Sequence, residues 1–218
     1  MRIIRQSYEI LSDISNGIDM LKFIEKCGRV CYKSEDKITE NSAENFVKSL
    51  IKSKHESVLE HQSITVKFTI SRATSHQLVR HRIASYSQAS QRYCNYSKGT
   101  FGSEITFVLP YRYRNEDLSN PSAACLTWIY SMESAEHDYM MLISQDGNKP
   151  EDAREVLPNS TMTEVVVTAN LREWRTIFKL RTDSAADGPI REIMTNLVKE
   201  LKSKIPVVFD EILKEEKK

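Results

Sequence analysis

Residues 63–70 read Ser-Ile-Thr-Val-Lys-Phe-Thr-Ile, and apolar side chains alternate with polar ones along the whole run. Successive side chains of a β-strand point to opposite faces of the sheet, so this period of two predicts a strand with one buried face. Ser71 follows directly and can cap a helix. We expect that helix to carry His76, Gln77 and Arg80. A strand that leads into a capped helix is the local frame from which the rest of the chain is interpreted.

Helical periodicity appears on both sides of this strand. Residues 18–32 place apolar side chains on one helical face, and a second helix is expected from Asn41, where Glu44 stands as in a capping box. Further helices are expected after Pro121, after Pro150, over 171–181 and from about 190, with short strands at 104–109 and 165–170. Several helices and separated strands predict an α+β fold, with mixed helices and a mainly antiparallel sheet, in a single domain over 1–218. The tail at 214–218 is expected to be a frayed helix end, and the loops at 95–103 and 144–150 to be mobile.

The composition favours a folded, nearly neutral protein. The chain has 218 residues, 40% of them hydrophobic, and a formal net charge of +1. A dedicated nucleic-acid-binding domain usually carries a strong basic excess, so no nucleic-acid partner is expected. The N-terminus lacks an apolar signal core, and no apolar run approaches the length of a membrane span. The four cysteines do not match a zinc pattern, so we expect a cytoplasmic protein with no metal and no membrane contact.

The most distinctive stretch is residues 80–92, Arg-His-Arg-Ile-Ala-Ser-Tyr-Ser-Gln-Ala-Ser-Gln-Arg. Potential cations bracket a run of hydroxyl and amide side chains, and no acid stands among them. Guanidinium groups match phosphate oxygens in pairs, and the hydroxyl and amide groups could bind the edge of a nucleotide base. A solvated basic turn is the plainer alternative. The density of polar donors favours a site for a small anionic ligand.

This stretch resembles the signature of the flavin-dependent thymidylate synthases: Arg-His-Arg, seven intervening residues, Ser, and an Arg two positions further on. Arg80, His81, Arg82, Ser90 and Arg92 fit it. The resemblance implies the α+β fold of that family and a homotetramer with active sites between subunits. The chain has six glycines and no G-x-G-x-x-G pattern, which makes a Rossmann flavin site unexpected.

Two further blocks extend the resemblance. Residues 54–61 contain two histidines and two glutamates, but their spacing does not fit the helical zinc pattern, and a polar loop is the plain alternative. The family contacts flavin with this element, which implies that role for Ser57 and Glu60 and a place on the folate or flavin side for His55. Arg154 precedes a Leu-Pro pair, as does the family's arginine that reaches the nucleotide phosphate.

The third block is residues 170–181. Helical spacing directs Leu171, Trp174 and Phe178 to the core and predicts a solvated face. The polar residues on that face are Arg172, Arg175 and Lys179, and Arg181 could extend it. The resemblance instead implies that Asn170 and Arg172 contact flavin, while Arg181 contacts the uracil and promotes loss of its ring N–H proton. A nearby guanidinium favours an anion and lowers the pKa of the group that forms it.

The resemblance therefore implies a reaction in which methylenetetrahydrofolate gives a one-carbon unit to dUMP and NADPH-reduced FAD supplies the hydride that completes dTMP. Arg181 is the implied catalytic residue. The implied dUMP contacts are Gln77, Arg80, Gln88, Ser90, Arg92, Arg154 and Arg181. The implied FAD contacts are Ser57, Glu60, Arg80, His81, Arg82, Asn170 and Arg172. The alternatives are a non-catalytic homologue that binds nucleotide and flavin, and a nucleic-acid-binding module, which the near-neutral charge disfavours.

Overall fold

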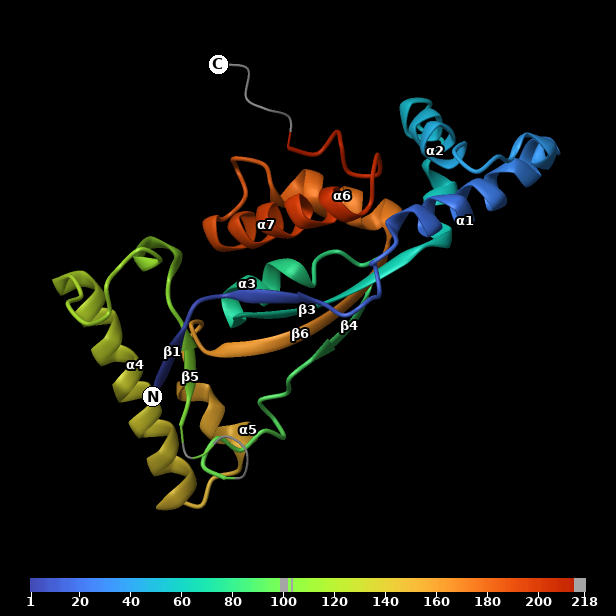
Figure 1. Ribbon diagram of the computed structural model, residues 1–218. Coiled ribbons are helices and arrows are strands. Elements are labelled where there is room, and N and C mark those ends of the chain that lie inside the picture. The colour runs from blue at the N-terminus through green and yellow to red at the C-terminus, as the bar shows by residue number, and fades with distance from the viewer. Residues whose placement is uncertain (99–101, 103, 214–218) are drawn as a thin grey trace. The chain divides into compact units, whose positions relative to one another are not determined.

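A computed structural model describes residues 1–98, 102 and 104–213, and it has the expected α+β fold (Figure 1). The strands are β1 (Arg2–Ile4), β2 (Ser7–Ile10), β3 (Ser63–Ser71), β4 (Ser85–Gln88), β5 (Thr106–Val108) and β6 (Met162–Asn170). The α-helices are α1 (Gly17–Arg29), α2 (Ala43–Lys52), α3 (Arg72–Leu78), α4 (Ala123–Ser144), α5 (Pro150–Ala153), α6 (Leu171–Arg181) and α7 (Gly188–Lys204). Short 3-10 helices include η1 (Val30–Tyr32), η2 (Glu35–Lys37), η3 (Glu56–His61), η5 (Tyr111–Tyr113) and η6 (Arg154–Val156). The expected helix end at 214–218 lies outside the described residues, as do positions 99–101 and 103 of the expected loop.

The chain divides into two compact units. The first unit comprises Met1–Ser7, Phe68–Arg80 and Ser87–Val165. The second unit comprises Tyr8–Lys67, His81–Tyr86 and the chain from Val166 onward. Strands β2, β3, β4 and β6 contribute residues to both units, and each unit is described by itself below.

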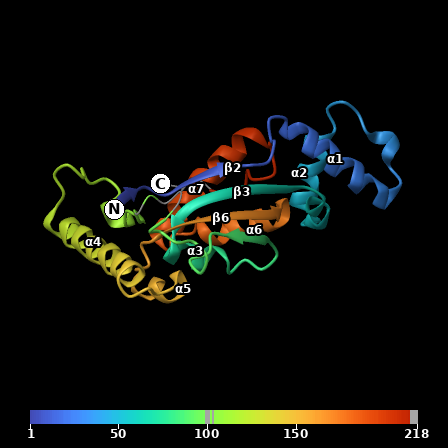
Figure 2. The ribbon, with the colours of Figure 1, turned by 90° about the horizontal axis from the view of Figure 1, so that it is seen from below.

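Four strands form one sheet in the order β2-β3-β6-β4 (Figure 2). The hydroxyls of Thr65 and Thr168 lie 2.8 Å apart. Further along β3, the Arg72 N–H donates to the Thr161 carbonyl at 3.0 Å. In these two contacts the residue numbers rise along β3 and fall along β6, so the two strands are antiparallel. The sheet as a whole is mainly antiparallel. In β3 the predicted alternation is confirmed, because Ile64, Val66, Phe68 and Ile70 are all buried.

The predicted start of α3 is confirmed. Ser71 is its N-cap, and the Ser71 hydroxyl accepts from the Thr74 N–H at 3.2 Å. The helix ends at Leu78, so Arg80 lies beyond it and the prediction that α3 carries Arg80 is wrong. The predicted capping box at Asn41 is also wrong, because α2 begins one residue after its N-cap Ser42.

Ser42 is used for a tertiary contact and not for a helix cap. Its hydroxyl donates to the Glu25 carboxylate at 2.7 Å, and Arg29 holds the same side chain at 2.7 Å. Glu25 is only 1% exposed, so these two donors compensate a buried charge. Helices α1 and α2 pack closely here: a Cβ at Gly28 would lie 2.8 Å from the ring of Phe46, so any larger residue would require that ring to move.

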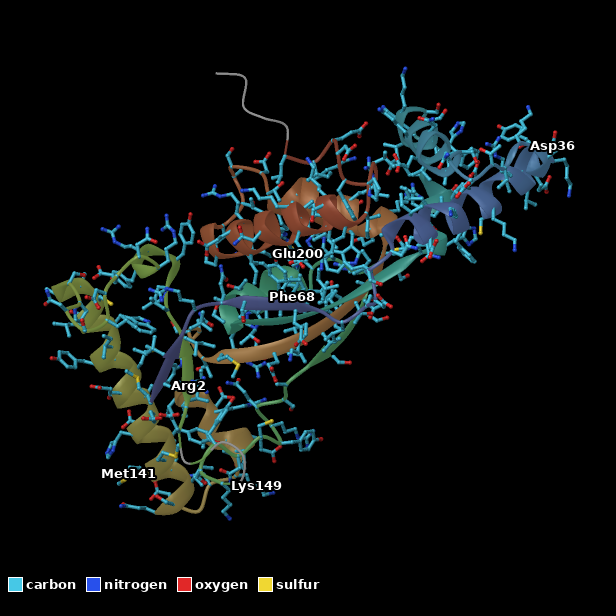
Figure 3. All side chains as sticks on the ribbon, in the orientation of Figure 1. Arg2, Asp36, Phe68, Met141, Lys149 and Glu200 are labelled. Carbon is cyan, nitrogen blue, oxygen red and sulfur yellow. The ribbon has the colours of Figure 1, made fainter. Side chains whose placement is uncertain are left out.

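The core of the second unit is built around α6. Trp174 is buried, donates from its indole to the Ile64 carbonyl at 3.0 Å, and stacks on Phe178 with 5.4 Å between ring centroids. Helix α7 packs along α6 (Figure 1). Glu200, labelled on α7 in Figure 3, accepts from the Tyr8 hydroxyl at 3.0 Å and ties α7 to β2. The predicted core face of α6 is therefore confirmed for these aromatic positions.

The core of the first unit lies under α4. Met132 and Tyr139 are buried, and the ring of Tyr139 meets that of Tyr96 edge-on at 5.5 Å. Trp128 is half-buried and donates to the Ser160 hydroxyl at 3.2 Å. Lys149, labelled in Figure 3, precedes the Pro that opens α5, as predicted. Strands β1 and β5 pair in parallel within this unit.

No helix in the described part of the chain is long and apolar enough to span a membrane. Among the same residues, no group of three or more His, Cys, Asp or Glu side chains is arranged to hold a metal ion.

Candidate functional site

In the first unit, Gln88 is anchored by hydroxyl groups. Its amide nitrogen donates to the Ser75 hydroxyl of α3 at 3.0 Å and to the Thr163 hydroxyl of β6 at 3.3 Å. Both partners are buried, whereas Gln88 is half-buried. The structure thus fixes one face of this amide before any ligand arrives. Gln77 is also half-buried on α3, and Arg80 is exposed just beyond that helix.

Ser90 and Arg92 form a second local arrangement in this unit. The Ser90 hydroxyl accepts from the Arg92 backbone N–H at 3.2 Å, which shapes the turn after β4. The Arg92 guanidinium donates to Glu151 of α5 at 2.7 Å, and its side chain is 59% exposed. An exposed pair of this kind contributes little to stability. An incoming anion can therefore compete with Glu151 for Arg92 at small cost.

Arg72 is a candidate binding residue that the sequence analysis missed. Its terminal nitrogen donates to the Ala89 carbonyl at 2.8 Å, next to Ser90. Its Nε is buried and has no hydrogen-bond partner in the described part of the chain. Burial lowers the pKa of Arg72; the charge and hydrogen bond of Tyr96 oppose this shift, and the positive charge of Arg154 adds a smaller lowering. Two guanidinium groups that repel each other, one with an unsatisfied buried donor, favour a bound anion.

A sequence signal for Arg72 did exist. It is the first residue of α3, where the partial positive charge of a helix N-terminus disfavours a cation. Arg72 therefore carries a charge that the start of a helix disfavours, and such a local conflict often indicates a functional position.

In the second unit, η3 lies beside the start of α6. The Leu171 N–H donates to the Gln62 carbonyl at 2.9 Å, which holds the two segments together. Glu60 and Arg172 form an ion pair at 2.5 Å, and both side chains are about half exposed. Asn170 is the N-cap of α6, and its amide oxygen accepts from the Glu173 N–H at 2.8 Å. Three residues predicted to bind flavin therefore lie together, with the Asn170 amide nitrogen directed away from the cap.

Most of the remaining residues predicted to contact flavin or folate are exposed. His55 is the exposed N-cap of η3, and Ser57 is exposed within that helix. Arg82 is exposed, whereas its neighbour His81 is buried.

Arg175 corrects the expected solvated face of α6. It is 1% exposed, and its terminal nitrogens donate to Glu56 and Glu211 at 3.1 Å each and to the Val208 carbonyl. A buried guanidinium needs such partners, because an unpaired charge in the interior is costly. Arg175 therefore joins η3 to the segment after α7.

Arg181 and His81 form a partly buried contact at the other end of α6. The Arg181 Nε–H donates to His81 Nε2 at 2.9 Å, so the ring proton of neutral His81 is on Nδ1. Burial lowers the pKa of His81 to about 4, and the charge of Arg181 contributes. His81 is therefore neutral near pH 7 and accepts from Arg181 without carrying a charge of its own.

Two side chains that the sequence analysis missed surround His81. Glu173 lies 3.9 Å from His81 Nδ1, too far for a hydrogen bond but close enough for an electrostatic effect. Burial raises the pKa of Glu173. The Tyr86 hydroxyl donates to the His81 carbonyl at 2.6 Å. Burial raises the pKa of Tyr86 to about 12, with Glu173 contributing, so Tyr86 acts as a neutral donor that fixes the backbone of His81.

Comparison with known proteins identifies the family. The family model described as thymidylate synthase complementing protein matches residues 14–207. The chain belongs to this family, that of the flavin-dependent thymidylate synthases. The flavin-dependent thymidylate synthase of Geobacter sulfurreducens is 36% identical over 188 residues, which cover 83% of this chain and 77% of that protein.

Other members of the flavin-dependent thymidylate synthase family show similar agreement. The probable flavin-dependent thymidylate synthase of Mycobacterium phage D29 is 34% identical over 197 residues, or 86% of this chain and 81% of the relative. That of Corynebacterium aurimucosum is 32% identical over 201 residues, or 86% of this chain and 78% of the relative. The resemblance seen in the sequence is confirmed at the level of the family.

Proposed function

We propose that this chain converts dUMP to dTMP, with methylenetetrahydrofolate as one-carbon donor and NADPH-reduced FAD as hydride source. This is a methyl transfer coupled to a reduction. The observation that carries the proposal is the contact of Arg181 with neutral, buried His81. A guanidinium whose Nε–H is held by a fixed, neutral acceptor has a set direction, as stabilisation of an anionic uracil ring requires.

The polar residues of the first unit would hold dUMP. The arginines supply guanidinium groups for the phosphate, and the anchored amide of Gln88 offers a directed contact for the base or ribose. The proposed set is Gln77, Arg80, Gln88, Ser90, Arg92 and Arg154, with Arg72 added from its unpartnered Nε. Arg181 would contact the uracil.

The polar residues of the second unit fit a flavin. The Arg172 guanidinium suits an anionic oxygen of the cofactor, and the Asn170 amide nitrogen suits a ring carbonyl. The proposed set is Ser57, Glu60, His81, Arg82, Asn170 and Arg172, together with Arg80 of the first unit, with His55 on the folate side. Bound FAD supplies the redox chemistry, and the protein supplies position and charge. We further propose a single cytoplasmic domain that acts as a homotetramer.

Release of tritium from ring-labelled dUMP tests the reaction. Purified protein receives FAD, NADPH and methylenetetrahydrofolate, and tritium release is measured together with dTMP. Release that requires flavin supports the proposal. A protein that binds both dUMP and FAD but releases no tritium would instead be the non-catalytic binding homologue.

A further inference from the structure

A pocket of about 330 Å³ opens on the second unit. Its lining comes from the end of α2, from η3, from α6 and from the chain beyond α7. Its charged residues are Lys52, Lys54, Arg172, Lys179, Glu56 and Glu211. Four cations and two carboxylates therefore line one small volume.

The two carboxylates of this pocket are already engaged. Glu56 and Glu211 each bond to the buried Arg175 at 3.1 Å, and Arg172 pairs with Glu60. In contrast, the three lysines form no ion pair with any residue that the structure describes. The pocket therefore has an excess of positive charge, and the unpaired cations would attract an anionic group with several negative oxygens.

Lys54 lines the pocket at the end of helix α2. Its backbone lies in the left-handed region at φ 59°. The Lys54 N–H donates to the Ile51 carbonyl at 3.0 Å and the His55 N–H to the Leu50 carbonyl at 2.9 Å, so this conformation closes the C-terminus of the helix. The helix end therefore fixes the backbone of Lys54 in the pocket wall.

The position of the pocket indicates the class of ligand. Lys54 precedes His55, and Glu56 opens η3, which carries Ser57 and Glu60. The pocket thus adjoins the residues proposed for flavin and folate, and it shares Arg172 with them. A co-substrate bound there would direct any anionic extension into this volume.

We propose that the pocket binds the glutamate tail of the folate co-substrate. The inference rests on the proposed function, which makes a folate the co-substrate. Each glutamate added through its γ-carboxyl contributes one more carboxylate, and three unpaired lysines can bind several carboxylates in turn. The 2′-phosphate of NADPH has the same anionic chemistry, so the experiment separates the two sources.

Binding of tetrahydrofolate with one or five glutamates to the FAD-loaded protein tests the proposal. Exposed ion pairs are individually weak, so the three lysines together should make the longer tail bind about tenfold more tightly. The variant Lys52→Gln/Lys54→Gln/Lys179→Gln should reduce this gain to less than about twofold, with little change for the single-glutamate form. A variant that keeps the full gain overturns the proposal. Loss of the preference for NADPH over NADH, with the folate gain intact, assigns the pocket to the nicotinamide phosphate and also overturns it.

Two glycine substitutions give a matched control. Lys33 also has positive φ, at 49°, but does not line the pocket. Lys33→Gly and Lys54→Gly should both raise the melting temperature, because glycine relieves the backbone strain. Only Lys54→Gly should weaken the response to tail length, and equal responses in the two variants would contradict the role of Lys54.

Failure of the proposed function has a different readout. Tripolyphosphate, a small polyanion, should raise the melting temperature of the flavin-free parent more than that of the triple variant. If the parent shows this difference but neither binds folate nor releases tritium, the result contradicts both the proposed reaction and the assignment of the pocket to folate. If the parent turns over dUMP but shows no effect of tail length and no effect of tripolyphosphate, the proposed reaction is supported and the proposed anion pocket is contradicted.

Discussion

Arg72 in the first unit differs from Arg175 and Arg172 in the second in how its charge is compensated. Arg175 meets two carboxylates and a carbonyl, and Arg172 meets Glu60. Arg72 donates to the Ala89 carbonyl and lies near the guanidinium of Arg154. A buried Nε without a hydrogen-bond partner among the described residues is common to Arg72 and Arg175, so the difference lies in the carboxylates. An anionic ligand would supply for Arg72 the negative charge that glutamates supply in the second unit. Arg181 donates to His81, which is fixed in place and neutral.

The largest expected effect comes from Arg181. Arg181→Ala should lower kcat by about 10²- to 10³-fold, the usual result of removing one group that stabilises transition-state charge. FAD affinity should change much less, because Arg181 is assigned to the uracil. Tritium release and a flavin titration measure the two effects, with Arg172→Ala as the variant expected to weaken FAD instead. A loss of FAD from Arg181→Ala as large as its loss of turnover would contradict the assignment.

Arg175 should have the largest effect on stability. Arg175→Ala leaves Glu56 and Glu211 without their buried partner and should lower the free energy of unfolding by about 3 kcal/mol or more. Arg172→Ala removes only an exposed pair and should cost less than about 1 kcal/mol. Urea unfolding of the two variants gives the comparison. Equal losses would show that the burial of Arg175 is energetically unimportant.

His81 should make stability depend on pH. Its pKa falls from 6.5 in the unfolded chain to about 4 in the folded one, so the unfolded chain binds the proton more readily. The stabilisation is therefore present above pH 6.5 and is lost as the pH falls towards 4. The difference between the parent and His81→Gln in the free energy of unfolding should change by about 3 kcal/mol over this interval.

Glu173 and Tyr86 are present in both the parent and His81→Gln. Their own titration therefore largely cancels in the difference between the two free energies of unfolding. Arg181 is common to both as well. A difference between the parent and His81→Gln that stays constant from pH 7 to pH 4 would rule out a depressed pKa for His81.

Arg72 should have the smallest of these effects. Arg72→Gln should weaken dUMP binding by about tenfold, which corresponds to the loss of one charge-assisted hydrogen bond. Binding of deoxyuridine, which lacks the phosphate, should change little. Arg5→Gln is a matched control, because Arg5 also donates to backbone carbonyls of the first unit, those of Arg114 and Glu116. Equal weakening of both ligands would place Arg72 in a purely structural role.

Local patterns predicted much of the fold. The alternation in β3, the Ser71 cap of α3 and the aromatic core face of α6 all depend on neighbours within a few residues, and all are confirmed. The cap at Asn41 was wrong because the N-cap of α2 is Ser42, whose hydroxyl donates to Glu25 instead of capping the helix. The end of α3 was misplaced because no local signal separates Gln77 from Arg80.

The charged residues of the site were harder to predict, since their partners lie far along the chain. Arg175 stands four residues after Leu171 and three before Phe178, so helical spacing placed it on the buried face, but its charge led to the opposite expectation. Its partner Glu211 could not be identified from sequence. Arg72 was missed for the same reason, because the Ala89 carbonyl that holds it belongs to a separate turn.

The two tryptophans of the chain offer a way to follow its folding by fluorescence. Trp128 lies in the first unit and is half-buried, whereas Trp174 lies in the second and is fully buried. Two variants with a single indole each, Trp128→Phe and Trp174→Phe, would therefore report separately on the two units. Coincident emission changes during denaturation would indicate one cooperative transition, and separate midpoints would reveal an intermediate in which one unit has unfolded before the other.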